Sequence, residues 1–292
     1  MNTLKSTIQK FCKLYGIYPS KSKGQNFLVN ESVYREIIRH ANLTKDDTVL
    51  EVGPGLGTLT ELLAQNAKRV VAVELDKKLI EILRAQLVSY KNIEIIQGDV
   101  LQLATYNPQL TTDYKIVANL PYNITSHFIR KFLTEENKPS LMVLMLQKEV
   151  AERICAKPKD MSMLSFSVQW YAHPQVMSFV SRKDFWPEPK VDSAIIKITP
   201  YQKEKIDESL RIAQVDEKML FRVVKWGFAS KRKQLHNNIS NGLYSMIKRK
   251  VDIKEIQDIL EQCKIHPQVR AQELSMQDWL NLASKLHMNY KA

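Results

Sequence analysis

Apolar strands and helical patterns alternate through the first half of the chain. Five short runs are apolar almost throughout, at residues 48–52, 69–74, 93–96, 114–118 and 141–146. The intervening segments repeat apolar residues at helical spacing, as at Val33, Ile37 and Ala41 in the segment before the first run. Continuous apolar strands separated by helices are typical of a parallel sheet covered on both faces. The pattern therefore predicts an α/β fold.

The pattern changes in the second half of the chain. A helix carrying Leu164, Val168 and Tyr171 precedes two further strands, at 176–180 and 193–198. No strand pattern follows Pro200, and helix caps are expected at Asp216 and Ser275. We therefore expect two domains: residues 1–200 as an α/β domain with a basic N-terminal segment 1–30, and residues 201–292 as a smaller all-helical domain.

Charge indicates the kind of partner. The 292 residues include 43 Lys and Arg against 31 Asp and Glu, a net charge of +12. Such a balance favours a polyanion, most commonly nucleic acid, although a solvated basic surface is the alternative. The three cysteines, Cys12, Cys155 and Cys263, are too few and too scattered for a disulfide framework or a zinc site. No apolar run is long enough to span a membrane, and residues 1–13 lack the pattern of a secretory signal, so a cytoplasmic protein is expected.

A glycine-rich turn follows the first strand. Gly53, Gly55 and Gly57 are each two residues apart, and Glu51 precedes the first glycine by two. This spacing departs from the dinucleotide fingerprint GxGxxG and resembles the first motif of S-adenosylmethionine-dependent methyltransferases. Read alone, it could be an ordinary turn between a strand and a helix.

Two acids strengthen the cofactor interpretation. Glu74 ends the second strand, where a carboxylate can accept hydrogen bonds from ribose hydroxyls, and Asp99 follows the third, where one can accept from an adenine amine. Each alone could be a solvated strand-end acid. Because the carboxyl ends of successive parallel strands form the ligand-binding edge of an open sheet, together they predict a site for S-adenosylmethionine. No metal is expected.

The segment Asn119-Leu120-Pro121-Tyr122 follows the fourth strand, beside the predicted cofactor. The Asn119 side-chain oxygen and the Leu120 carbonyl could accept the two hydrogens of an adenine amine and expose its lone pair to a methyl donor. Tyr122 would stack on the base, with Phe185 as a second face. The alternatives are an ordinary turn with a packed aromatic and, for Phe185, a core side chain.

Six segments together resemble one family. They are 23–28, 51–60, 119–122, 185–193, 231–235 and 270–275. In order, they resemble the KsgA-type small-subunit ribosomal RNA adenine dimethyltransferases over nearly the whole chain, with Gln272 a departure where the family often has Glu. The resemblance implies a Rossmann-like methyltransferase sheet and N6,N6-dimethylation of two adjacent adenosines in a hairpin loop near the 3′ end of small-subunit rRNA, late in assembly. S-adenosylhomocysteine would be the product. The cofactor contacts implied or predicted are Gln25, Asn26, Leu28, Gly53, Gly55, Glu74, Asp99 and Asn119.

A basic stretch in the helical domain is the expected RNA contact. Its members are Lys225, Lys231, Arg232, Lys233, Lys248, Arg249 and Lys250, with no acid among residues 225–250. Contacts of this kind with phosphates weaken steeply with salt; a solvated helix face is the alternative. The expected partner is small-subunit rRNA within the assembling small subunit, bound by a monomer.

Two rival functions remain open from the sequence. A large-subunit rRNA adenine methyltransferase of the antibiotic-resistance type shares the fold and a similar Asn-x-Pro-Tyr motif. A non-catalytic RNA-binding assembly or transcription factor on the same fold is the second. The segments 185–193 and 270–275 favour the small-subunit enzyme over the first, and the acids and amide of the site, Glu74, Asp99 and Asn119, argue against the second.

Overall fold

The chain forms two compact units. The computed structural model describes residues 3–17, 19, 26–102, 113–249 and 251–290. One unit comprises Met1–Glu152 and Ala172–Pro200, and the other comprises Arg153–Tyr171 and Tyr201–Ala292. The segment Arg153–Tyr171 thus falls in the second unit, whereas the sequence placed it in the first. The physical reason is that the Phe166 ring packs edge-on against Phe221, with ring centroids 5.5 Å apart, and so belongs to the second unit's core.

A seven-stranded sheet is the centre of the first unit, with strand order β4-β3-β2-β5-β6-β9-β7. Its strands are β2 (Thr48–Val52), β3 (Arg69–Glu74), β4 (Ile93–Gln97), β5 (Tyr114–Asn119), β6 (Leu141–Gln147), β7 (Ala172–Val180) and β9 (Ser193–Pro200). The first five are parallel, as predicted, but β9 pairs antiparallel with both β6 and β7. The sheet is therefore mixed.

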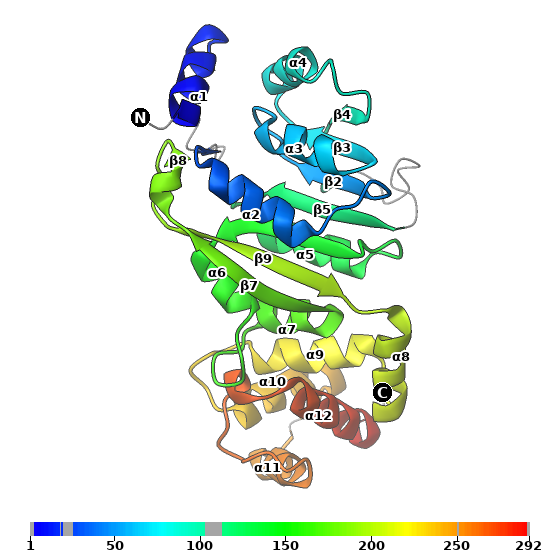
Figure 1. Ribbon diagram of the computed structural model, residues 1–292. Coiled ribbons are helices and arrows are strands. Elements are labelled where there is room, and N and C mark those ends of the chain that lie inside the picture. The colour runs from blue at the N-terminus through cyan, green and yellow to red at the C-terminus, as the bar shows by residue number, and fades with distance from the viewer. Residues whose placement is uncertain (1–2, 18, 20–25, 103–112, 250, 291–292) are drawn as a thin grey trace. The chain divides into compact units, whose positions relative to one another are not determined.

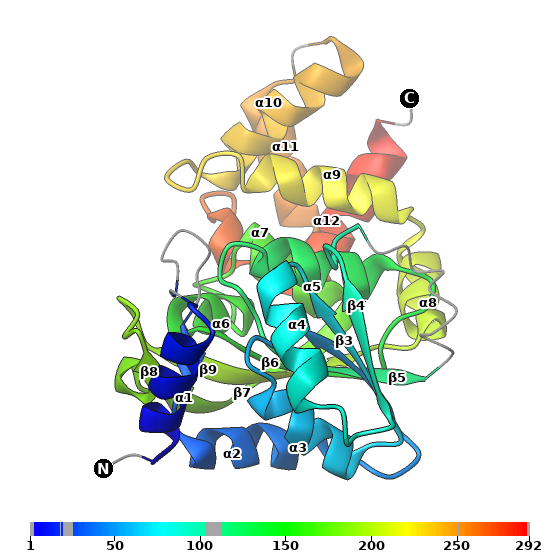
Figure 2. The same cartoon turned by 90° about the horizontal axis from the view of Figure 1, so that it is seen from above.

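Helices cover the sheet on both faces. The helices of this unit are α1 (Thr3–Leu14), which packs on α4 rather than on the sheet, α2 (Glu31–Ala41), α3 (Thr58–Asn66), α4 (Lys77–Gln86), α5 (Thr125–Thr134) and α6 (Lys148–Ile154), whose last two residues fall in the second unit. Figure 1 shows α2 in front of the sheet and α5 behind it, and Figure 2 shows α2 and α3 side by side. Ile37 of α2 and Leu63 of α3 lie fully buried in one core cluster with the sheet residues Val70 and Val143.

A second, two-stranded sheet joins distant segments of the same unit. Its strands, β1 (Phe27–Leu28) and β8 (Phe185–Trp186), run antiparallel, with Leu28 paired to Phe185. The Val29 amide donates to the Asp184 carbonyl over 2.7 Å, and the Asn30 side chain donates to the Asp184 carboxylate over 2.9 Å. Two of the family-like segments are thereby held against each other.

Helices make up the second unit. They are α7 (Met163–Tyr171), α8 (Lys203–Ala213), α9 (Glu217–Gly227), α10 (Leu235–Ile247), α11 (Ile253–Gln262) and α12 (Met276–Asn289). The predicted caps are present: Asp216 accepts from the Met219 amide at 2.6 Å, and Ser275 and Asp278 form a capping box. Trp279 of α12 is fully buried in this core. Across the described part of both units, no helix has the length and apolar character needed to cross a bilayer.

Candidate active site

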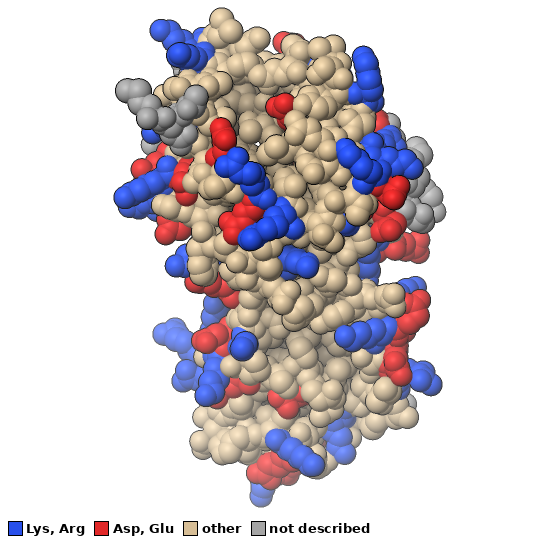
Figure 3. Space-filling view, viewed as in Figure 1, with Lys and Arg blue, Asp and Glu red and all other residues tan. Residues whose placement is uncertain are grey.

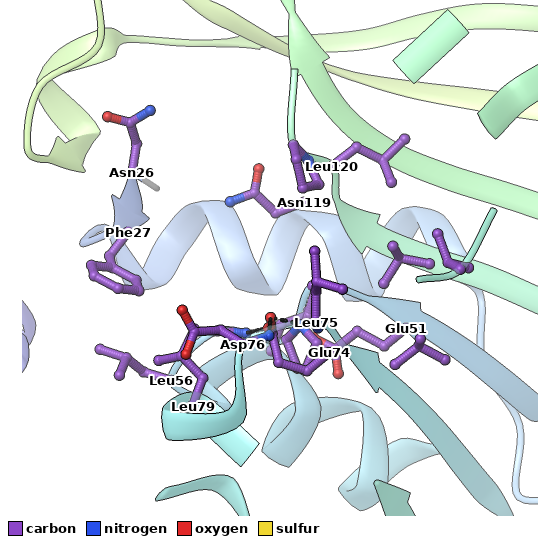
Figure 4. A pocket seen from close by; sticks show the side chains of 18 of the residues that line it. Asn26, Phe27, Glu51, Leu56, Glu74, Leu75, Asp76, Leu79, Asn119 and Leu120 are labelled. Carbon is purple, nitrogen blue, oxygen red and sulfur yellow. Dashed lines mark hydrogen bonds between the residues drawn. The ribbon is translucent and has the colours of Figure 1, made fainter. Parts of the chain in front are cut away.

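A cavity of about 510 Å³ opens at the carboxyl edge of the sheet in the first unit. Residues after β2, β3, β4 and β5 line it (Figure 4). The sheet grows from β2 toward β3 and β4 on one side and toward β5 and β6 on the other. The cavity therefore lies at the topological switch point, where open α/β sheets bind ligands.

The glycine turn forms one wall of this cavity. Gly53 has φ of 63° and Gly55 has φ of 60°, left-handed conformations that favour glycine. A Cβ on Gly55 would come within 3.5 Å of the Phe27 ring, and one on Gly53 within 3.7 Å of Pro121. Without side chains, both residues leave their backbone open toward the cavity, as a ligand that approaches the main chain requires.

Glu74 ties the neighbouring turns together. Its carboxylate accepts hydrogen bonds from the amides of Leu75 at 2.9 Å and Asp76 at 3.0 Å, and from Gly55 at 3.3 Å. The residue is 7% exposed, and burial raises the pKa of its carboxyl even though these amides act in the opposite direction. Glu74 thus fixes the glycine turn and still presents carboxylate lone pairs to the cavity it lines.

Asp99 lies on the adjoining wall, after β4. One of its carboxylate oxygens accepts from the Leu101 amide at 2.9 Å. The preceding residue, Gly98, donates its amide to the Glu74 carbonyl over 2.9 Å, which links this turn to β3. Both Gly98 and Asp99 line the cavity, so the two strand-end acids, Glu74 and Asp99, lie around the same cavity.

Asn119 ends β5 on the opposite side of the cavity. Its carboxamide extends into the open space near Asn26 and Phe27 (Figure 4). Within the described residues this side chain has no hydrogen-bond partner, and neither has the Leu120 carbonyl, although the Leu120 amide donates to the Met145 carbonyl over 3.0 Å. Two acceptors therefore remain available at the end of one strand.

Tyr122 is held by a residue from β9. Its hydroxyl and that of the buried Ser193 are 2.9 Å apart. Burial raises the pKa of the Tyr122 phenol, with the Ser193 hydrogen bond acting in the opposite direction. The phenol stays neutral around pH 7, and its anchored hydroxyl orients the ring at the cavity.

Glu51 is a site residue that the sequence reasoning did not assign. It lines the cavity, is 1% exposed, and its Oε2 has no hydrogen-bond partner among the described residues. Burial, with the nearby charge of Glu74, raises the pKa of Glu51 to about 8. The nearby Thr60 hydroxyl acts to lower this pKa, although its oxygen makes no hydrogen bond of good geometry to a described residue. The signal was present in the sequence, as the acid two residues before Gly53.

The remaining predicted site residues are divided between the cavity and the core. Asn26 and Leu28 line the cavity, and Gln25 lies outside the described residues. Phe185 is 2% exposed, belongs to the core cluster beneath α2 and does not line the cavity. Phe185 is therefore a core side chain, which was the alternative interpretation of the sequence. Its stacking role stays a prediction, because the ring does not reach the cavity in this conformation.

The predicted RNA contacts form two groups in the second unit. Lys225, Lys231, Arg232 and Lys233 surround the connection from α9 to α10, whereas Lys248 and Arg249 follow the far end of α10. At about 1.5 Å per residue, the helix separates the groups by roughly 20 Å. All six are exposed and none makes a salt bridge to a described residue; Lys250 lies outside the description. On the face shown in Figure 3, basic and acidic side chains are interspersed.

No group of His, Cys, Asp and Glu suited to a metal is present in the ranges that the structure describes. Cys12, Cys155 and Cys263 form no disulfide; Cys12 is buried, and Cys155 and Cys263 are partly exposed. The polar groups at the cavity are thus carboxylates, amides and hydroxyls.

A sheet with this strand order, a glycine turn and strand-end acids around one cavity defines a Rossmann-like methyltransferase. A family described as ribosomal RNA adenine dimethylase matches residues 19–287. The chain belongs to this family.

Sequence relatives support the assignment. "Ribosomal RNA small subunit methyltransferase A" of Dehalococcoides mccartyi is 40% identical over 266 residues, 91% of this chain and 87% of the relative. The protein of the same name from Geobacillus thermodenitrificans is 39% identical over 279 residues, 93% of this chain and 92% of the relative.

Solved structures agree with the fold. A dimethyladenosine transferase from Plasmodium falciparum has a TM-score of 0.72 and 27% identity, covering 89% of this chain and 96% of that one. The 23S rRNA methyltransferase ErmE has a TM-score of 0.65 and 24% identity, covering 89% and 99%. The likeness to ErmE is one of fold.

Proposed function

We propose that this protein uses S-adenosylmethionine to dimethylate N6 of two adjacent adenosines in the 3′-terminal hairpin loop of small-subunit rRNA, late in subunit assembly. The family and the names of its relatives support the reaction and the substrate. The observation that carries the chemistry is the pair of free acceptors, the Asn119 carboxamide and the Leu120 carbonyl, on the rim of a cavity whose other wall is the glycine turn.

The cavity fits the proposed cofactor. Gly53 and Gly55 keep one wall free of side chains. The buried Glu51 Oε2 has no hydrogen-bond partner among the described residues, and a bound ligand could supply one. Glu74 would accept from the ribose hydroxyls and Asp99 from the adenine amine, with Asn26 and Leu28 completing the site. When bound, S-adenosylmethionine supplies an electrophilic methyl group on its sulfonium, and S-adenosylhomocysteine is the product.

The chain's own contribution to methyl transfer is positioning. An exocyclic adenine amine is a weak nucleophile because its lone pair is delocalised into the ring. Asn119 and the Leu120 carbonyl would accept its two hydrogens and so favour a pyramidal nitrogen with an available lone pair. The proton is lost after transfer, when the nitrogen has become acidic, so no strong general base is required.

Tyr122 would hold the base by stacking. Its ring lines the cavity, and the 2.9 Å contact of its hydroxyl with Ser193 fixes its direction. A target base must leave its helical stack to reach such a pocket. Phe185 could give a second face only after a rearrangement of the segment that buries it.

The first unit would carry out the chemistry and the second would bind RNA. Lys225, Lys231, Arg232, Lys233, Lys248 and Arg249 are exposed and without salt-bridge partners among the described residues, as phosphate contacts require. Lys250 and Gln25 stay predictions from the sequence. Because the proposed substrate is ribosomal RNA, the protein would act in the compartment where ribosomes assemble. That it acts as a monomer is also part of the proposal.

The rival functions have less support. The large-subunit methyltransferase shares the fold at 24% identity, whereas relatives near 40% identity carry the small-subunit name. A non-catalytic factor would not need Glu74, Asp99 and Asn119 gathered around one cavity.

Replacing Asn119 tests the proposed chemistry. Asn119→Ala removes one acceptor from the rim, so single-turnover methylation of unmethylated small subunits should slow by roughly 10²- to 10³-fold, the usual effect of losing one preorganised hydrogen bond. The unfolding midpoint reports whether the fold is intact, and rates measured at saturating S-adenosylmethionine separate the acceptor role from the cofactor contact also expected of Asn119. Asn289→Ala, at the exposed end of α12, is the control. An Asn119→Ala rate within a few-fold of wild type would rule out the acceptor role.

A further inference from the structure

An exposed aromatic ring lies near the end of β7, outside the cavity. Phe179 is 57% exposed, although large apolar side chains on strands are usually covered. The Lys148 ammonium lies 4.7 Å from the centre of its ring and 4.0 Å from the Glu152 carboxylate, at the limit of a salt bridge. A cation beside an exposed ring is the pairing that proteins use to hold a nucleotide, with the ring against the base and the cation near the phosphate.

Strand pairing places this ring on the same edge of the sheet as the substrate rim. Asn119 pairs with Met145, Met145 with Ile195, and Ile195 with Ser178, the residue before Phe179. Three strand spacings of about 4.8 Å put Ser178 roughly 14 Å from Asn119. A few linked nucleotides of an RNA loop can span that distance.

Two exposed lysines lie in the segment that follows Phe179. Lys183 and Lys190, in the segment between β7 and β9, are exposed and have no salt-bridge partner among the described residues. Three acids lie in the same segment: Glu188 contacts the Arg182 guanidinium at 3.0 Å, Asp184 accepts from the Asn30 side chain, and Asp192 accepts from the Arg182 amide at 3.0 Å. The basic and acidic residues of segment 181–192 balance, so this segment offers a phosphate two lysines free of salt bridges rather than a net positive charge.

We propose that Phe179 and Lys148 form a binding site for a nucleotide that flanks the target adenosine, its base stacked on the exposed ring and its phosphate near the ammonium. This inference rests on the proposed function, because it takes the cavity as the site of an RNA base. It assigns substrate recognition to the first unit in addition to the basic groups of the second. Stacking of this kind is tolerant of base identity, so the contact would position the loop rather than select its sequence.

The test compares three variants of the full chain. Phe179→Ala removes the ring, Phe179→Trp keeps an aromatic surface, and Val88→Ala changes another exposed apolar residue of the first unit. Each is measured for affinity to unmethylated small subunits, affinity to deproteinised small-subunit rRNA, and affinity to S-adenosylmethionine. We expect Phe179→Ala to bind both RNA substrates about tenfold more weakly, with cofactor affinity unchanged, as loss of one base stack predicts. Phe179→Trp and Val88→Ala should match wild type.

Each other outcome has a defined meaning. If Phe179→Ala binds RNA as wild type does, or if Phe179→Trp loses as much as Phe179→Ala, the stacking site is wrong. A loss confined to intact subunits would assign the surface to a ribosomal protein and would also overturn the inference. Failure of the proposed function would be seen separately, as a wild-type protein that methylates no small subunits.

Discussion

Asn119 and Glu51 show how single polar residues mark this site. The Asn119 carboxamide has no hydrogen-bond partner in the described chain, and the Glu51 carboxyl is buried with an unpartnered oxygen. Buried polar groups normally find partners, because leaving one unsatisfied costs about 1–3 kcal/mol. The buried Glu51 oxygen is best explained by a ligand that completes it, and the partly exposed Asn119 carboxamide lines the same cavity with its hydrogen-bonding groups free.

Glu51 should make the stability of the ligand-free protein depend on pH. Its pKa is raised from 4.5 to about 8 in the folded protein, so the folded state binds this proton more tightly than the unfolded state. The associated stability is fully present below about pH 4.5 and is lost as pH rises through about 8. The loss amounts to a few kcal/mol at most, at about 1.4 kcal/mol per pH unit.

Glu51→Gln should remove this dependence, because the amide cannot ionise. Urea unfolding between pH 5 and 8 should show the variant gaining on wild type as pH rises. Glu81→Gln, an exposed carboxyl of α4, is the control and should follow the wild-type profile. A Glu51→Gln profile parallel to wild type would show that Glu51 ionises normally in the folded protein.

At the scale of elements, the close packing of α9 against α12 depends on a glycine of α9. A Cβ on Gly227 of α9 would lie 2.3 Å from the Trp279 ring of α12, and Trp279 is fully buried. Gly227→Ala should therefore lower the unfolding free energy by about 1–3 kcal/mol, despite a helix-propensity gain of about 1 kcal/mol. Denaturant unfolding followed by helix content measures this change.

Asn241→Ala is the matched control, because it adds helix propensity at an exposed position of α10. It should leave stability within about 0.5 kcal/mol of wild type or raise it slightly. Equal stability of Gly227→Ala and wild type would mean that α9 and α12 do not pack as closely as described.

Much of the site follows from element order, and the rest depends on contacts that are distant in sequence. Apolar runs identify the parallel strands, and their ends bring Gly53, Glu74, Asp99 and Asn119 to one edge. The pattern of apolar and polar residues along a strand does not show the direction in which the strand runs, so the antiparallel pairing of β9 was not predictable. Phe185 is buried because β8 pairs with β1, far away in the chain, and no local signal reports that pairing.

The whole molecule presents its predicted RNA contacts as two groups rather than one patch. α10 separates Lys231, Arg232 and Lys233 from Lys248 and Arg249. A contiguous stretch of sequence is thus divided by the length of a helix, and each group can meet a different phosphate segment. If both groups bind phosphates, the protein would recognise the shape of a folded rRNA rather than its base sequence.

Salt dependence tests these contacts. Each phosphate contact contributes about 0.7–0.9 to the slope of log affinity against log salt. Replacing Lys231, Arg232 and Lys233 together with Ala should reduce that slope by about 2–3, and replacing Lys248 and Arg249 by about 1–2, measured by binding to unmethylated small subunits. Lys91→Ala, an exposed lysine of the first unit, is the control. An unchanged slope in both group variants would leave the basic stretch as a solvated helix face.

The most direct test of the central claim is transfer of labelled methyl groups to ribosomal subunits. Wild-type protein, labelled S-adenosylmethionine and small subunits lacking the two dimethyladenosines should yield label in small-subunit rRNA. Position-by-position mapping should then find two adjacent N6,N6-dimethyladenosines in the 3′-terminal hairpin loop. Label in large-subunit rRNA instead, or no transfer to either subunit, would contradict the account.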